Sequence, residues 1–403
     1  MTARLLQARC QTDELFRIIR PEFLYDRPIP ERHRVVFYIG HLEAFDWNLL
    51  SGPLGLKSFN PSFDRLFAFG IDPVDGNLPT DQPGDWPSLE HIYHYRDRVR
   101  EELDRAIDAT NDQLLNVAIE HRLMHAETLA YIFHQMSVEK KTGPLAALQV
   151  PDHDLVPRTV DVPSGPATLG LPREANVFGW DNEFDAHTVQ VPAFAIDKYK
   201  VTNGQFLEFM NDGGYSNRKL WSGDNRTWKE SQAIAHPAFW ISRNGMWMWR
   251  SMFAEIPLPL DWPVYVSHAE ASAYATWAGR ALPTEAQWHR AAIGTNGVQE
   301  PRAGNYDPAP VHALDASEFG VVGMVGNGWE WTSTQFQPFP GFRRFDCYPG
   351  YSEPFFDGKH FVLKGGSVRT AACMLRPSFR NWFQPQYQYV YAGFRCIEKE
   401  PTG

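Results

Sequence analysis

The sequence predicts two domains of different fold classes, an all-α domain followed by an α+β domain. First, 403 residues are more than a single hydrophobic core usually holds. Second, apolar residues in the N-terminal third recur at helical spacing. Third, the composition changes near Lys140, beyond which the chain is dense in Gly, Pro and Trp. We place the linker at residues 141–144 and expect the domains to span residues 1–145 and 146–403.

The first domain is expected to be a bundle of long helices. Residues 88–107 and 111–136 have the apolar spacing of helices, and so does the segment around His41. Between these segments, residues 58–87 are rich in Pro, Gly and Asp and predict a long loop, which is often a functional element. Long helices with short links are typical of bundles, whose cores commonly hold metal sites.

Short helices are expected in the second domain at three capping signals. One helix follows Thr202, a second follows the capping box of Ser267 and Glu270, and a third follows Thr284. Few helices among many irregular turns indicate an α+β domain with much of its backbone in loops.

The strongest functional signal is a pair of histidines within residues 111–136. His121 and His125 stand four residues apart, so they lie one turn apart on the same helix face. Two imidazoles placed this way can bind one metal ion and leave coordination positions open. Glu127 lies roughly 120° further around the helix, so a contact to a neighbouring helix suits it better than ligation. Such pairs also occur by chance, so a third ligand is needed.

His41 is the candidate third ligand. It lies in an apolar, helix-forming segment and should face the same core as the histidine pair. A buried imidazole needs a polar partner. A three-histidine site shared by two helices would supply a partner for all three residues, whereas ordinary core histidines are the alternative interpretation.

Composition and charge exclude several functional classes. The formal net charge is −10, and no Lys/Arg cluster stands out, which argues against nucleic acid and anionic membranes as partners. No apolar run reaches transmembrane length, and the N-terminus lacks the apolar core of a signal peptide. The four cysteines have no metal-site or disulfide spacing, so a reducing, cytoplasmic location is the simplest expectation.

Five segments of the second domain resemble the formylglycine-generating-enzyme-like domain, which has a C-type-lectin-like core. They are FAIDKYKVTN (194–203), ALPTEAQW (281–288), GNGWEWT (326–332), LKGGS (363–367) and GFR (393–395). Their order and spacing cover residues 155–398. The resemblance implies that this fold follows the helical domain.

A helical domain with His41 and the run HRLMHAE (121–127), fused to that fold, resembles one family. It comprises the non-haem iron sulfoxide synthases of ergothioneine and ovothiol biosynthesis and the related selenoneine synthases. The resemblance implies a DinB-like four-helix bundle and Fe(II) held by His41, His121 and His125. It also implies an O2-dependent bond between the imidazole C2 of hercynine and sulfur or selenium. Phe45 and Met124, beside the predicted ligands, become candidate substrate contacts.

The same resemblance assigns Asn381 and Trp382 to hercynine, whose trimethylammonium group suits an aromatic face. Family members that use γ-glutamylcysteine continue with Asp and place Arg four residues later, where this chain has Phe383 and Tyr387. A zwitterionic donor would leave its charges unpaired there.

A neutral sugar donor fits these residues better. Aromatic faces and amide side chains bind sugars, and Phe383, Gln384 and Tyr387 supply both kinds. We therefore predict a selenosugar donor and carbon–selenium bond formation, as in selenoneine biosynthesis. The alternative is an ergothioneine-type sulfoxide synthase that joins hercynine to cysteine or γ-glutamylcysteine.

The family also carries a catalytic tyrosine, for which Tyr348 is the nearest candidate. A purely structural tyrosine is the alternative, and Trp329 and Trp331 are expected in the domain core. Two other functions fit the sequence less well. A formylglycine-generating oxidase needs a cysteine pair, and residues 377–392 contain no cysteine. A non-catalytic lectin-like module would leave three core-facing histidines unexplained.

Overall fold

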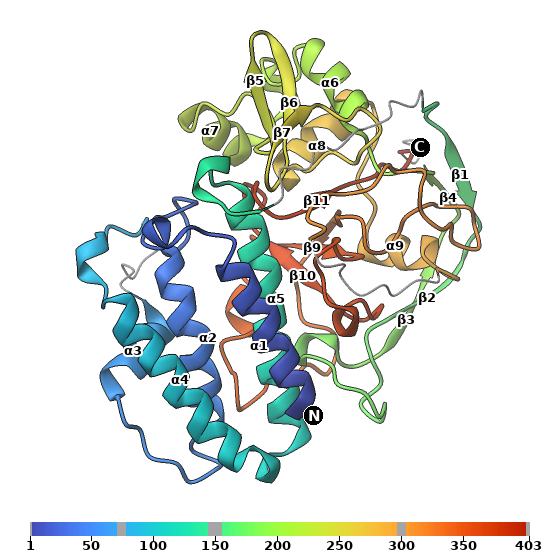
Figure 1. The fold of residues 1–403 in the computed structure, drawn as a ribbon. Helices are drawn as coiled ribbons and strands as arrows, with labels where there is room; N and C mark the ends of the chain where they lie inside the picture. Colours follow the sequence, from blue (N-terminus) through green and yellow to red (C-terminus); the bar gives the residue numbers. More distant parts are fainter. Residues whose placement is uncertain (1, 71–77, 144–154, 296–303, 400–403) are drawn as a thin grey trace. The chain divides into compact units, whose positions relative to one another are not determined.

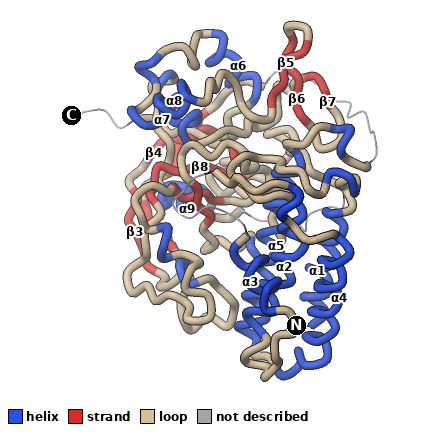
Figure 2. Tube along the Cα trace, turned by 90° about the vertical axis from the view of Figure 1, so that its left-hand side faces the viewer, coloured by secondary structure: helices blue, strands red, loops and turns tan. Residues whose placement is uncertain are grey.

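The chain divides into two compact units, Met1–Leu145 and Ala146–Gly403. The computed structural model describes residues 2–70, 78–143, 155–295 and 304–399 (Figure 1). Helices make up the first unit, and short strands, short helices and long loops make up the second (Figure 2).

The first unit is a helical bundle in which α2 occupies the centre. Its helices are α1 (Thr2–Phe16), α2 (Val35–Leu50), α3 (Pro61–Phe69), α4 (Leu89–Ala106) and α5 (Asp112–His134). α2 packs against α3, α4 and α5, and α1 packs along α5 (Figures 1 and 2). A helix that contacts three others is apolar on most of its surface, which explains why the α2 sequence lacks a polar face.

Two of the three predicted long helices have the expected ends and faces. α5 begins after Asn111, whose side chain accepts a hydrogen bond from the Leu114 amide at 2.9 Å. α4 buries one stripe of residues at helical spacing. That stripe is Ile92, Tyr95, Val99 and Leu103.

The prediction of one continuous loop over residues 58–87 is wrong. α3 forms within it, because Asn60 caps the helix by accepting from the Phe63 amide and Pro61 takes the first helical position. Residues 71–77 of the predicted loop lie outside the described residues.

The second unit is an α+β domain built from small sheets. Its strands are β1 (Thr159–Val162), β2 (Gly165–Leu169), β3 (His187–Val191), β4 (Phe194–Asp197), β5 (Trp240–Arg243), β6 (Met246–Arg250), β7 (Glu255–Pro257), β8 (Trp329–Gln335), β9 (Phe361–Lys364), β10 (Asn381–Phe383) and β11 (Ala392–Gly393). The largest sheet has the order β10-β9-β8-β11, in which only the β8–β11 pair is parallel. The domain also contains a three-stranded sheet, β5-β6-β7, and two separate strand pairs, β1-β4 and β2-β3.

Each of the three predicted capping signals in this domain is followed by a helix. α6 (Asn203–Asn211), α8 (His268–Trp277) and α9 (Glu285–Ala291) each begin after a complete capping box. A further helix, α7 (Gly223–Ser231), was not predicted, and its Ser222 cap makes no side-chain hydrogen bond.

Buried ion pairs and tryptophans hold the largest sheet in place. Glu330 of β8 is fully buried and receives hydrogen bonds from Lys200 at 2.7 Å and from Arg395 at 2.7 and 2.9 Å. Trp329 and Trp331 are buried in the core, as predicted. The sheet therefore presents β10 from a rigid framework.

Among the described residues, none of the helices combines the length and the apolar character needed to cross a membrane.

Candidate metal centre

Three histidines from two helices of the first domain meet in one cluster. His41 comes from the middle of α2, and His121 and His125 lie one turn apart on α5. One ring nitrogen from each residue lies within 4.8 Å of the others. The ring centroids of His121 and His125 are 4.6 Å apart. The structure therefore brings together all three residues that the sequence singled out as ligands.

A hydrogen bond fixes the tautomer of His41. Its Nδ1 lies 2.7 Å from the carbonyl oxygen of Phe67, and because a carbonyl only accepts, Nδ1 carries the hydrogen. The Nε2 atom of His41 then holds a lone pair and points at Nε2 of His125, 3.2 Å away. Orientation of a ligand ring by its second nitrogen is the usual arrangement in metal sites.

The separation of these two Nε2 atoms suits a shared cation. Two imidazoles bound at about 2.1 Å, with a bond angle between octahedral and tetrahedral, have nitrogens about 3.0–3.4 Å apart. The observed 3.2 Å falls inside this interval. The donor set therefore fits a first-row divalent metal such as Fe(II), with positions left for other ligands.

Burial keeps the three imidazoles neutral, which is the form that binds metal. Removal from water lowers the pKa of His41 to about 4, although its bond to Phe67 opposes this change. Burial also lowers the pKa of His121 and His125 well below the usual value, and the neighbouring histidines add to the effect. No proton has to leave these rings at neutral pH before a metal ion binds.

Aromatic rings surround the cluster. Phe45 stacks on His121 with ring centroids 3.4 Å apart and planes 9° apart, and Phe37 stacks on His41 at 4.8 Å. Met124 precedes His125 on α5 and is half-buried. In the part of the chain that the structure describes, no carboxylate joins the three ligand atoms, and Glu127 is buried outside the cluster.

The residues predicted to bind hercynine lie on β10 of the second domain. Asn381 accepts a hydrogen bond from the Trp382 amide at 2.9 Å, which fixes its carboxamide. The indole of Trp382 stacks on Phe336 with centroids 4.1 Å apart and planes 7° apart. Trp382 is half-buried, so its ring is held rigidly while part of it stays accessible.

The residues predicted to contact the donor come directly after Trp382 in the sequence. Phe383 and Tyr387 stack on each other, with centroids 4.8 Å apart and planes 6° apart. Gln384 is exposed, and Gln386 donates to Asn225 of α7 at 2.8 Å. An aromatic pair therefore occupies these two positions.

The ring of Tyr351 lies next to Trp382, and the ring of Tyr348 lies next to Tyr351. Tyr351 contacts Trp382 edge-on at 5.3 Å and stacks on Trp180 at 3.9 Å. Tyr348 lies 5.6 Å from Tyr351, and burial raises the pKa of its phenol. The sequence did not single out Tyr351, because its ring contacts with Trp382 and Trp180 arise only in the fold.

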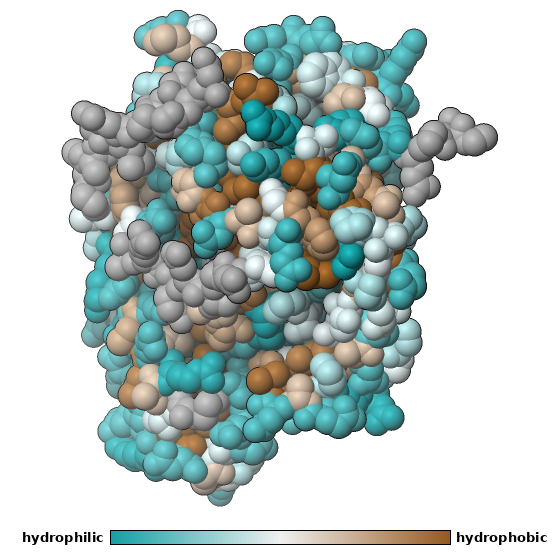
Figure 3. Space-filling view, turned by 90° about the vertical axis from the view of Figure 1, so that its right-hand side faces the viewer, coloured by the Kyte–Doolittle hydropathy of each residue, from teal (hydrophilic) through white to brown (hydrophobic). Residues whose placement is uncertain are grey.

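A separate cavity of about 570 Å³ lies in the second domain, between α9, β2 and the residues after β9. Trp288, Trp329 and Phe379 contribute to its walls, and none of the predicted site residues does. Figure 3 faces the side on which β2 and α9 lie and shows apolar residues gathered among hydrophilic ones.

Two family models match the chain. The DinB superfamily matches residues 4–138, and the Sulfatase-modifying factor enzyme 1-like domain matches residues 146–400. These matches confirm the predicted fold class, a DinB-like helical domain followed by a formylglycine-generating-enzyme-like domain.

Curated relatives match along most of the chain. Hercynine oxygenase of Mycolicibacterium thermoresistibile is 36% identical over 386 residues, covering 89% of this chain and 85% of the relative. Hercynine oxygenase of Mycolicibacterium smegmatis is 33% identical over 390 residues, covering 89% and 88%. Ergothioneine biosynthesis protein 1 of Schizosaccharomyces pombe is 28% identical over 435 residues, covering 95% of this chain and 54% of that protein.

Proposed function

The chain belongs to the family that includes the mycobacterial hercynine oxygenases, and we propose that it is a non-haem iron enzyme acting on hercynine. In this proposal the enzyme joins the imidazole C2 of hercynine to the selenium of a selenosugar, using O2. His41, His121 and His125 hold Fe(II). Asn381 and Trp382 bind hercynine, and Phe383, Gln384 and Tyr387 bind the donor.

The observation that carries this proposal is the 3.2 Å approach of the His41 and His125 Nε2 atoms. The lone pair of His41 Nε2 faces His125 Nε2, and a cation between these two nitrogens would be bound by both rings. Bound Fe(II) would supply the redox chemistry with O2. Three protein ligands leave the remaining positions for substrates.

The residues of this chain orient the reactants and limit access of water. Phe45 covers one face of His121, and Phe37 lies against His41, so water reaches these rings poorly. Trp382 offers an aromatic surface to a trimethylammonium group. Either tyrosine of the loop, Tyr348 or Tyr351, supplies a phenol for proton transfer, and Tyr348 is the residue that we propose.

The proposed coupling balances with O2 as the oxidant. The C2–H bond of hercynine and the Se–H bond of the donor break, and the C2–Se bond forms. Two electrons and two protons pass to O2, which is released as hydrogen peroxide.

The stacked pair of Phe383 and Tyr387 supports a neutral donor. It offers an aromatic face, and Gln384 offers an amide, which together suit the faces and hydroxyl groups of a sugar. A γ-glutamylcysteine donor would bring two carboxylates and an ammonium group to this pair without partners of opposite charge.

A sulfur donor is the second candidate, and one observation favours it. The ergothioneine biosynthesis protein 1 of Schizosaccharomyces pombe matches 95% of this chain. In that case cysteine or γ-glutamylcysteine would replace the selenosugar, and the three-histidine site would be unchanged.

A parallel turnover assay tests both the proposed activity on hercynine and the choice of donor. Fe(II)-loaded protein, hercynine and O2 are incubated with a selenosugar, cysteine or γ-glutamylcysteine, and the products are identified by mass spectrometry. We expect preferential turnover of the selenosugar, and none with His121→Ala. Preferential turnover of an amino-acid donor would overturn the selenium assignment, and no hercynine consumption with any donor would overturn the proposed function.

A further inference from the structure

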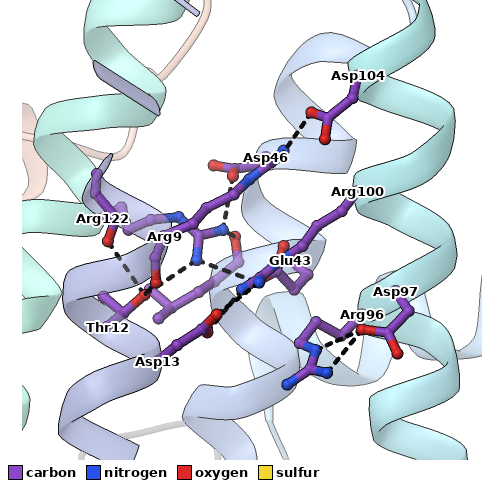
Figure 4. A network of polar contacts seen from close by, with 12 residues as sticks. Arg9, Thr12, Asp13, Glu43, Asp46, Arg96, Asp97, Arg100, Asp104 and Arg122 are labelled. Carbon is purple, nitrogen blue, oxygen red and sulfur yellow. Dashed lines mark hydrogen bonds and ion pairs between the residues drawn. The ribbon is translucent and has the colours of Figure 1, made fainter. Parts of the chain in front are cut away.

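A cluster of buried charges lies next to the three histidines in the sequence of both helices. Arg122 follows His121 on α5, and its side chain is 1% exposed. On α2, the buried carboxylates Glu43 and Asp46 lie two and five residues after His41. Figure 4 shows these groups converging between the helices.

Arg122 binds α2 at three separate acceptors. One terminal nitrogen donates to Asp46 Oδ2 at 2.7 Å and to the Leu42 carbonyl at 2.9 Å. The other donates to Glu43 Oε1 at 3.1 Å. A planar guanidinium that holds three acceptors along one helix fixes both the rotation and the axial position of that helix.

Further ion pairs connect the Arg122 cluster to α1 and α4. Arg100 of α4 donates to Glu43 at 2.7 Å and forms two bonds to Asp13 of α1, at 2.7 and 2.8 Å. Arg9 of α1 pairs with Asp104 of α4 at 2.6 Å. The pairs therefore connect all four long helices, with Glu43 shared between the inner and outer parts (Figure 4).

Burying these charged groups between the helices costs free energy. Charged groups lose their hydration, and apolar side chains of the same size often stabilise a core equally well or better. What an apolar core does not provide is a single register between two helices, because hydrophobic contacts tolerate sliding whereas a multidentate guanidinium does not.

We infer that Arg122 is a positioning residue that sets the register of α2 against α5 and thereby the spacing of the three histidine nitrogens. This inference rests on the proposed metal site. A shift of one residue along a helix is about 1.5 Å. Ligand atoms must be held within about 0.5 Å, so even a partial slip would open the 3.2 Å gap between His41 and His125.

Arg122→Lys separates positioning from charge balance. Lysine keeps the positive charge between Glu43 and Asp46 but cannot hold three acceptors in a planar fork. Arg105→Met is the matched control, because Arg105 forms an exposed ion pair with Glu101 on α4, away from the buried cluster. The probe is cobalt(II), whose visible absorption reports both binding and coordination geometry.

Purified full-length wild type, Arg122→Lys, Arg105→Met and His121→Ala are titrated with cobalt(II), and near-ultraviolet circular dichroism checks folding. We expect Arg122→Lys to be folded, to bind cobalt(II) roughly 10–100-fold more weakly and to have an altered spectrum. Arg105→Met should match wild type. A folded Arg122→Lys with wild-type affinity and spectrum would overturn the inference.

Two further results separate this inference from the metal site itself. If His121→Ala binds cobalt(II) like wild type, the proposed metal site fails, and the positioning role fails with it. If Arg122→Lys does not fold, Asp46→Ala decides the question by the same criteria, since it removes one of the three acceptors on α2 and leaves Arg122 itself in place. Weaker binding with a changed spectrum supports the inference, and unchanged binding overturns it.

Discussion

The rings of Phe383 and Tyr387 stack face to face, with centroids 4.8 Å apart and planes 6° apart. Phe383 and Tyr387 stand at the positions where, by the family resemblance, Asp and Arg would pair with a charged donor. The two aromatic residues therefore act as one unit, and a change to either alters the surface of both.

Replacing the pair should change donor choice. We expect Phe383→Asp with Tyr387→Arg to raise kcat/KM for γ-glutamylcysteine relative to the selenosugar by roughly tenfold or more, because the donor charges gain partners. Competition kinetics with both donors measures the ratio. Each single substitution serves as a control and should gain less, since it introduces one charge without its partner. An unchanged ratio in a folded double variant would exclude these residues from donor recognition.

Trp382 should contribute directly to hercynine binding. Removing its ring in Trp382→Ala should weaken binding by about 1–2 kcal/mol, the value of a cation–π contact in a partly desolvated site. Trp382→Phe keeps an aromatic face and should retain most of the affinity. Isothermal titration with hercynine compares the three proteins, and equal affinity in the alanine variant would remove Trp382 from the binding site.

Gly40 should be required for the orientation of His41. A Cβ at this position would lie 2.3 Å from the Phe67 ring, and the Phe67 carbonyl accepts the His41 hydrogen bond. We expect Gly40→Ala to cost about 1–3 kcal/mol of unfolding free energy and to weaken metal binding.

Gly52→Ala is the matched control, because a Cβ there meets nothing within 4 Å. Urea unfolding and cobalt(II) titration compare the two variants. Wild-type stability and affinity in Gly40→Ala would show that Phe67 moves aside without disturbing His41.

Stability should fall in mild acid partly because of His289. Burial, followed by the charge of Lys364, lowers the pKa of His289 to about 3. The unfolded chain binds a proton near pH 6.5, so the stabilisation is complete above that value and is lost as the pH falls toward 3. By pH 5 the loss is about 2 kcal/mol for this residue.

His289→Gln should reduce the change in unfolding free energy between pH 7 and pH 5, because the buried imidazole is removed. Urea unfolding at both pH values measures this difference. An identical pH dependence in wild type and His289→Gln would contradict the assignment.

Local sequence signals predicted the elements whose ends are fixed by nearby residues. The capping boxes at Thr202, Ser267 and Thr284 located three helices because each box satisfies backbone groups within one turn. The pairing of His121 with His125 could be predicted in the same way, since both residues lie on one helix.

Features that depend on distant contacts were not predictable in this way. α3 was missed because the Pro- and Gly-rich composition around it masked the cap at Asn60, and the acceptor that orients His41 was missed with it. Arg122 looked like an ordinary helical arginine, because its partners on α2 lie 76 and 79 residues away in the chain. Such pairings follow from helix packing and leave no periodic pattern in the sequence.

The most direct test of the metal centre is the iron content of single-histidine variants. Wild type, His41→Ala, His121→Ala, His125→Ala and the control His91→Ala are loaded with Fe(II) without oxygen, desalted and analysed for iron. We expect one iron per chain in wild type and His91→Ala, and little or none in the three ligand variants. Full iron content in all three ligand variants would rule out this metal site.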